Sequence, residues 1–435
     1  MRTALLSLFF LLFCSVVLRA QISSPSWLEK YIRVHASDSL LHLLNNPDSF
    51  RYQIIYTQIN RDKHNRPVFT HYYFNVSDSV YFNPASMVKL PTALMALEKL
   101  NRLAIPGLNK FTPMLTDSAA LGQHRYYADA SAENGLPSVA QYIKKIFLVS
   151  DNDAYNRLNE FVGQQELNEG LWKKGYSGTR ITRRFERLSP EQNRRSNPIR
   201  FVRGDTVAGA AVRGGGFMSG EDSVIYYQPA AYSSVHFDFG RKYLVGNAHY
   251  NSNDSLVHLP MDFTTHNVFT LRDMQRMLQA ILFPASVPAG QRFLLSEDDY
   301  RFLYRYMSEY PSEARFPRYD TSEYFDSYTK FFFFKSHRQK IPDHIRVFNK
   351  TGWSYGFLTD AAYVVDFKNK VEFMLSGTIY VNRDGIINDD KYDYENLGYP
   401  FFEEIGKLIY NFELKRQRKK LPDLNRFRIN YREAD

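Results

Sequence analysis

The chain has 435 residues, which is enough for one large domain or two ordinary ones. Apolar residues make up 44% of it, with 34 Phe and 31 Tyr, so a sizeable core can form and global disorder is not expected. The net charge of +9 could attract anionic partners, but no nucleic-acid-binding motif accompanies it. We therefore expect a solvated basic face and no nucleic-acid partner.

The first twenty residues predict a secretory signal peptide. Arg2 supplies a positive start, residues 4–17 are almost wholly apolar, and Ala20 offers a cleavage point. The apolar run is short for a membrane span. It contains the only cysteine, Cys14, but Phe13 is bulky where a lipoprotein signal has a small residue, so membrane anchoring is the less favoured alternative. We predict secretion across the inner membrane to the periplasm. A mature chain that begins after Ala20 would have no disulfide and no cysteine-ligated metal.

Hydrophobic periodicity predicts the elements of the first half of the chain. A helix is expected over 27–44, followed by two strands over 51–59 and 68–76 that are joined by a polar turn. Residues 87–100 are apolar nearly all round, which predicts a buried helix. Two further helices are expected over 139–148 and 153–161.

The second half changes character twice. From 201 to 263 the pattern is of short aromatic strands separated by Gly, Asn and Ser. Helices are then expected over 271–282 and 297–307, with Ser296 capping the second, and the apolar run 331–334 is assigned to the core. The closing elements are strands over 345–348, 362–365 and 371–380, a helix over 399–412, and a mobile basic tail over 416–435.

Three short motifs carry the chemistry: Ser86-x-x-Lys89, Ser150-Asp151-Asn152 and Lys350-Thr351-Gly352. On a helix, the first spacing puts a hydroxyl and an amine on one face, and a serine needs such a base to become a nucleophile. Each motif alone has an ordinary explanation as a helix cap, a turn or a strand end. In this order, however, they form the three-part signature of the penicillin-recognising serine enzymes.

Neighbouring residues extend the resemblance to class A β-lactamases. Pro91 follows Lys89 by two residues, and the run Ser150-Asp-Asn-Asp-Ala-Tyr-Asn-Arg-Leu158 resembles the pattern Ser-Asp-Asn-x-Ala-x-Asn-x-Leu. The resemblance runs from about residue 27 to 412, with an insertion at about 200–263 that could form a lid, an edge of the cleft or surface decoration.

The resemblance implies an α/β (α+β) fold of the β-lactamase/DD-peptidase type. One domain over 21–415 would hold an antiparallel sheet built from both ends of the chain, about 27–80 and 345–412, and covered by helices. A helical part would lie between, at about 81–340, with the site in the cleft. We expect a monomer with no cofactor and no metal.

The resemblance also implies a role for each motif residue. Ser86 would be the nucleophile and Lys89 the neighbouring base or proton relay. Ser150 would carry a proton to the leaving nitrogen, and Asn152 would bind the substrate's side-chain amide and help to hold Lys89.

The third motif would bind the substrate. Lys350 and Thr351 would hold its carboxylate, and Gly352 would let the strand backbone approach the ligand. The oxyanion hole would be formed by the backbone N–H groups of Ser86 and Trp353. The ring of Trp353, where the family commonly has a small residue, could narrow the cleft.

Hydrolysis of the acyl-enzyme depends on one further carboxylate. Class A enzymes place it in a pattern that resembles Arg-Trp-Glu-Pro-x-Leu-Asn, and here Arg184-Phe185-Glu186 fits while the residues that follow do not. Glu186 is the candidate for activating the deacylating water, and its alternative is an ion pair with the adjacent arginines.

Three functions therefore stay open at this point. The first is hydrolysis of a β-lactam or related cyclic amide, and the second is a D-alanyl-D-alanine peptidase or amidase acting on cell-wall peptides with Glu186 idle. The third is a non-catalytic envelope protein that only binds such ligands; the complete motif set argues against it.

Overall fold

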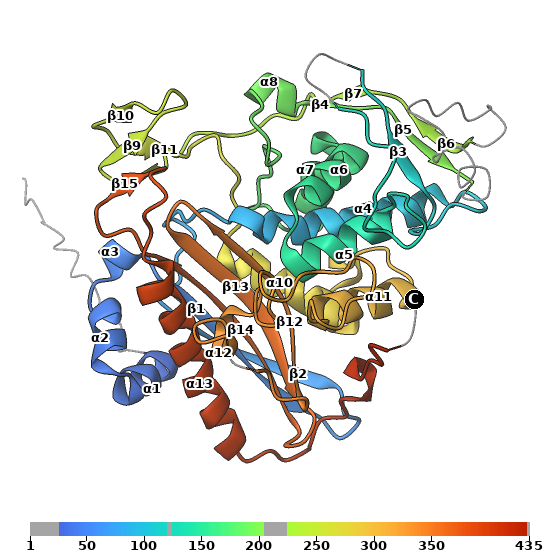
Figure 1. Ribbon diagram of the computed structural model, residues 1–435. Coiled ribbons are helices and arrows are strands. Elements are labelled where there is room, and N and C mark those ends of the chain that lie inside the picture. The colour runs from blue at the N-terminus through green and yellow to red at the C-terminus, as the bar shows by residue number, and fades with distance from the viewer. Residues whose placement is uncertain (1–25, 120–123, 204–223, 339, 433–435) are drawn as a thin grey trace, which may run out of the picture.

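The computed structural model describes residues 26–119, 124–203, 224–338 and 340–432, which include none of the predicted signal peptide or Cys14. Its centre is a five-stranded antiparallel sheet in the order β12-β13-β14-β1-β2 (Figure 1). The strands are β1 (Gln53–Arg61), β2 (Pro67–Phe74), β12 (Ile345–Ser354), β13 (Phe357–Asp366) and β14 (Val371–Tyr380). The expected sheet of strands from both ends of the chain is thus confirmed.

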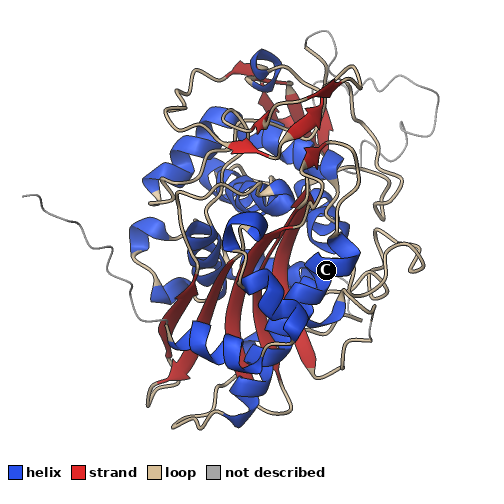
Figure 2. Ribbon diagram, turned by 90° about the vertical axis from the view of Figure 1, so that its left-hand side faces the viewer, coloured by secondary structure: helices blue, strands red, loops and turns tan. Residues whose placement is uncertain are grey.

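Alternation along the strands gives the sheet two apolar faces. In β1, Ile54 and Tyr56 belong to one core cluster and Ile55 and Ile59 to the other, as a two-residue period requires. The face that carries Ile54 and Tyr56 is covered by α1 (Trp27–His35), α2 (Asp38–Leu44), α3 (Pro47–Phe50), α12 (Phe331–Phe334) and α13 (Tyr399–Lys415). On the other face lie α10 (Leu271–Leu282) and α11 (Glu297–Ser308), and Figure 2 shows helices on both sides of the strands.

The middle of the chain forms the helical part that the resemblance implies. It comprises η1 (Ala85–Val88), α4 (Lys89–Leu103), α5 (Val139–Val149), α6 (Asn152–Val162), α7 (Gln164–Lys173) and α8 (Pro190–Asn193). Helix α4 is the buried one: its residues from Lys89 to Leu100 are all covered by neighbouring elements. No helix among the described residues is long and apolar enough to span a membrane.

Short strands form small sheets apart from the central one. They are β3 (Met114–Thr116), β4 (Arg195–Ser196), β5 (Ile199–Val202), β6 (Val224–Gln228), β7 (Ala231–Tyr232), β8 (Leu244–Val245), β9 (Ala248–Tyr250), β10 (Leu256–Val257), β11 (Met261–Asp262) and β15 (Ile386–Ile387). The remaining short helices are η3 (Pro284–Ser286), η4 (Ala289–Gln291), η5 (Tyr394–Gly398) and η6 (Asn425–Phe427). Residues 204–223 of the predicted insertion lie outside the described residues.

Two expectations need correction. The helix predicted over 27–44 is two helices, because Ser37 accepts a hydrogen bond from the backbone N–H of Leu40 and starts a new helix. The expected mobile tail is instead anchored on the core: Leu424 and Phe427 are buried, and the Phe427 ring centroid lies 4.9 Å from that of Tyr363. The apolar anchors within the basic sequence offset the entropy of ordering it.

Candidate active site

Ser86 lies in the 3-10 helix η1, one turn before α4, and not in the α-helix itself. A strained turn precedes it: Ala85 has φ of +45°, and Asn83 Oδ1 accepts a hydrogen bond of 2.9 Å from the Ala85 backbone N–H. A non-glycine residue adopts such a conformation only when its surroundings enforce it, and such positions cluster at functional sites. Ser86 is half-buried, whereas Lys89 is fully buried at the start of α4.

Gly352 brings the strand β12 against this turn. A Cβ atom at Gly352 would lie 2.5 Å from the Pro84 carbonyl oxygen and 2.9 Å from the Ser86 backbone nitrogen. All of these neighbours are backbone atoms, so only glycine allows the strand to pass so close. The strand predicted over 345–348 accordingly continues through the third motif to Ser354.

Lys89 joins the first motif to the second. Its Nζ donates to Asn152 Oδ1 at 2.6 Å, to Ser150 Oγ at 3.3 Å and to the Ser150 carbonyl oxygen. Ser150 ends α5 in a left-handed conformation with φ of +63°, and Asn152 begins α6. The turn between two packed helices therefore fixes both partners of Lys89.

Lys350 reaches the same hydroxyl from the sheet. Its Nζ donates to Ser150 Oγ at 2.9 Å, so this oxygen accepts hydrogen bonds from two lysines that are 261 positions apart in the printed sequence. Burial, followed by the charge of Lys350, holds the pKa of Lys89 well below its usual range. Burial also lowers the pKa of Lys350 to about 7, with the charge of Lys330 adding to the effect and that of Asp360 opposing it.

The other residues of the third motif lie beside this cluster. The buried Thr351 Oγ1 has no hydrogen-bond partner among the described residues, which is costly for a polar atom unless a ligand supplies one. Trp353 lines a pocket together with Ser86, called the Ser86 pocket below, and its ring packs against Tyr328 and Phe331 with centroid distances of 5.8 Å each.

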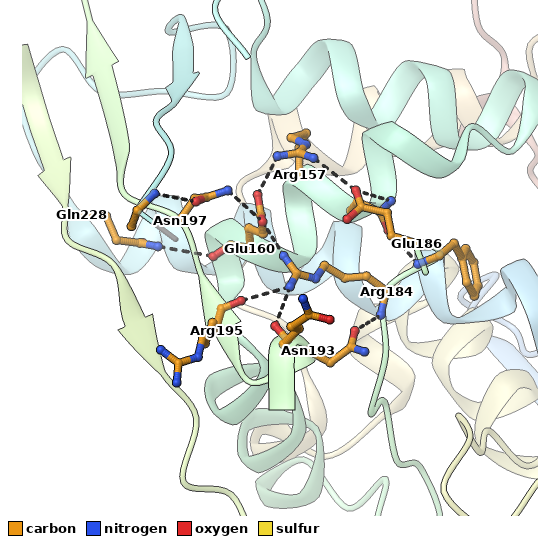
Figure 3. A network of polar contacts seen from close by, with 12 residues as sticks. Arg157, Glu160, Arg184, Glu186, Asn193, Arg195, Asn197 and Gln228 are labelled. Carbon is orange, nitrogen blue, oxygen red and sulfur yellow. Dashed lines mark hydrogen bonds and ion pairs between the residues drawn. The ribbon is translucent and has the colours of Figure 1, made fainter. Parts of the chain in front are cut away.

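Glu186 lies in the same pocket but is bonded to α6 (Figure 3). Its Oε1 accepts from Asn156 Nδ2 at 3.1 Å and from Arg157 Nη2 at 3.2 Å. Both interpretations of Glu186 stay open, because the carboxylate forms an ion pair and also lines the same pocket as Ser86. The arginine is Arg157, however, and not one of the adjacent arginines that the sequence suggested.

A buried network holds the loop that carries Glu186. Glu160 bridges two arginines, accepting from Arg157 at 2.9 Å and also from Arg184 (Figure 3). Arg184 further donates from Nη2 to the carbonyl oxygens of Gln192 at 2.9 Å and of Arg195 at 3.1 Å. Burial raises the pKa of Glu160 although both arginines oppose the shift. Removing one member would leave an uncompensated buried charge, so the loop is held firmly.

The pocket has a volume of about 480 Å³ and contains Ser86, Asn152, Glu186 and Trp353 together. Several of the residues that line it were not predicted from the sequence as site residues. Phe185 places its ring 5.2 Å from Lys89 Nζ, although its only signal was the aromatic position in the Arg-Trp-Glu pattern. Arg183 and His266 also line the pocket, and nothing in the sequence marked them.

The chain is similar to a known protein family in sequence and to solved β-lactamases in structure. The model of the β-lactamase enzyme family matches residues 48–211 and 242–412, and no curated protein matches the sequence. A β-lactamase from Sphaerobacter thermophilus is 11% identical, with a TM-score of 0.44 and coverage of 86% of this chain and 96% of that chain. A class A β-lactamase from Clostridium kluyveri is 13% identical, with a TM-score of 0.45 and coverage of 86% and 97%.

The family match spans well over half of the chain, and all three motifs lie inside it. It leaves residues 212–241 unmatched, within the stretch that the sequence marks as an insertion. The sheet of terminal strands and the helical part between them agree with that match, and the chain belongs to the β-lactamase enzyme family.

Proposed function

We propose that this protein is a hydrolase that opens a β-lactam or related cyclic amide through an acyl-Ser86 intermediate. The observation that carries the proposal is the convergence of Lys89 and Lys350 on Ser150 Oγ, in which Lys89 follows Ser86 by three residues and Lys350 lies on the strand that packs against the Ser86 turn. Since that oxygen accepts a hydrogen bond from the Nζ of each lysine, its own O–H is left to donate toward a ligand.

Acylation needs a base, and the burial of Lys89 suits it to this role. Its lowered pKa favours the neutral amine, which can take the proton from Ser86 Oγ–H as the oxygen attacks the amide carbon. The new bond joins Oγ to that carbon, and the C–N bond then breaks. The nitrogen leaves with a proton from Ser150, which Lys89 or Lys350 replaces from its own N–H.

Binding and charge stabilisation come from the strand. Lys350 and the unpartnered Thr351 Oγ1 would hold a carboxylate on the nitrogen side of the ligand. The backbone N–H groups of Ser86 and Trp353 would hold the oxyanion, and Gly352 allows the two backbones to come close enough for this.

Deacylation distinguishes the two catalytic candidates. Glu186 would take a proton from water as that water attacks the acyl carbon, the bond from that carbon to Ser86 Oγ would break, and Oγ would leave with the proton that Glu186 gives up, relayed by Lys89. The peptidase or amidase alternative is favoured by one observation, since Glu186 Oε1 already accepts from Asn156 and Arg157. If these contacts keep the Glu186 carboxylate from activating water, the acyl-enzyme persists.

The test is intact-protein mass after mixing the protein with benzylpenicillin, with Ser86→Ala as the control. Rapid drug loss with little lasting adduct supports the β-lactamase, and a stable adduct at Ser86 supports the peptidase. No adduct and no turnover would refute both as β-lactam-reactive enzymes and leave the binding protein. We further propose a periplasmic location, for which the support is the predicted signal peptide over residues 1–20.

A further inference from the structure

Arg183 stands at the wall of the Ser86 pocket in a fixed position. Its backbone N–H donates to Asn267 Oδ1 at 3.0 Å, and Asn267 Nδ2 donates to its carbonyl oxygen at 3.3 Å. Its side chain reaches His266, with 2.7 Å between Arg183 Nη1 and His266 Nε2. Asn267 is buried, so the backbone of Arg183 is held by hydrogen bonds to the interior of the protein.

The pair carries a full positive charge. Burial, followed by the charge of Arg183, lowers the pKa of His266 to about 3, so its imidazole is neutral at physiological pH. Nε2 must then accept from the guanidinium, which places the imidazole proton on Nδ1. The histidine orients Arg183 without cancelling its charge.

No carboxylate in the described ranges forms an ion pair with Arg183, in contrast to the two arginines that Glu160 bridges. Arg157 pairs with Glu160 and Glu186, and Arg184 pairs with Glu160. The carboxylate of Glu186, three residues along the chain from Arg183, is already bonded to α6. A half-buried guanidinium without a counter-charge is a site that an anionic ligand can complete.

The surroundings reinforce the positive charge. A smaller cavity of about 280 Å³ shares Arg183 and His266 with the Ser86 pocket, and Arg194 also lines it. Arg194 donates to the carbonyl oxygens of Ser233 at 2.8 Å and Val235 at 3.0 Å, which leaves its charge uncompensated by any described carboxylate. The net charge of the chain, +9, adds to the attraction of anions.

We propose that Arg183, oriented by His266, binds a second acidic group, carried on the acyl portion of the substrate. The inference rests on the proposed function, because that function assigns the two ends of the ligand. Lys350 and Ser150 lie at the end where the nitrogen leaves, so a carboxylate there uses Lys350. Arg183 shares its pocket with Asn152, which is expected to bind the amide of the acyl side chain. The substrate class is therefore a dianionic amide.

The test compares two penicillins that differ by one carboxylate: benzylpenicillin and its α-carboxyl derivative. Their dissociation constants are measured by calorimetry on Ser86→Ala, where no acylation occurs, and on the double variants that add Arg183→Gln or Arg183→Lys. Arg195→Gln is the matched control, because Arg195 is an exposed arginine that pairs with the exposed Glu191. It removes the same charge from the same region.

With Arg183 present, the carboxylated penicillin should bind about tenfold more tightly, as one charge-assisted hydrogen-bonded pair allows. Arg183→Gln should bring the two affinities together, Arg183→Lys should keep part of the preference, and Arg195→Gln should keep all of it. Equal binding by the Ser86→Ala protein, or a preference that survives Arg183→Gln, would overturn the proposal.

Failure of the subsite can be told apart from failure of the function. An adduct at Ser86 with benzylpenicillin, without any preference for the second carboxylate, rejects the subsite alone. If neither penicillin binds or reacts, the proposed function fails, and phenylmalonate serves as the probe in ligand-detected NMR. Binding that Arg183→Gln removes would still support the anion site, and the absence of such binding would reject it.

Discussion

Gly352→Ala tests whether the site depends on the close approach of β12 to the turn that carries Ser86. The added Cβ atom would lie 2.5 Å from the Pro84 carbonyl oxygen, 2.9 Å from the Ser86 nitrogen and 3.0 Å from the Met87 nitrogen. Ordinary packing of heavy atoms needs a separation of about 3.5 Å, so the strand and the turn must part by about 1 Å. Neither can yield by turning a side chain, because all three contacts are with backbone.

The displacement should reduce activity far more than it reduces folding. A shift of about 1 Å at a reacting group costs about 100-fold in rate, whereas overpacking by one methyl costs about 1–3 kcal/mol of stability. The assay is the rate constant for acylation of Ser86 by benzylpenicillin, followed by mass after rapid quenching. Circular dichroism during heating shows that the variant remains folded.

The matched control is Gly290→Ala, where an added Cβ atom meets nothing within 4 Å. It should leave both acylation and melting unchanged. A folded Gly352→Ala protein that acylates within about threefold of the parent protein would refute the argument, because it would mean that the strand and the turn can separate without moving the reacting groups.

Three further predictions concern charge. Glu186→Gln should lengthen the lifetime of the acyl-enzyme at least about 100-fold with little change in acylation, and an unchanged lifetime would mean that Glu186 is idle. Burial lowers the pKa of Lys350 to about 7, so its charged form predominates only below that pH. The kcat/KM should therefore fall as pH rises above 7, and a flat profile from pH 6 to 9 would contradict the role of Lys350. Glu160→Gln leaves Arg157 and Arg184 without their shared carboxylate. Urea unfolding should show a loss of about 3–5 kcal/mol, against less than about 1 kcal/mol for the exposed Glu191→Gln.

The fold was largely predictable because its signals are local. The strands at both ends, the buried helix α4 and the helices α10, α11 and α13 follow from hydrophobic periodicity, which reports the face that each segment buries. The tail shows the limit of this reasoning. Its basic composition predicts mobility, but Phe427 and Leu424 find apolar surface made by segments distant in the sequence. Composition does not contain that information.

The chemistry of the site was readable for a similar reason. Ser86, Lys89 and Lys350 are recognised by short spacings, because a helix turn or a strand end fixes the geometry of neighbouring residues. The sequence by itself thus determined which reactive groups exist, in which order, and which family they resemble.

Only the tertiary structure decided what those groups contact. The hydrogen bond from Lys350 to Ser150, the ion pair of Glu186 with Arg157 and the pairing of Arg183 with His266 each join separate segments of the chain. Such contacts depend on how the helical part packs against the sheet, and on which buried charges find partners in that packing. The physical reason is that desolvation and Coulomb interactions are set by distance in space, whereas a sequence pattern reports only the distance along the chain.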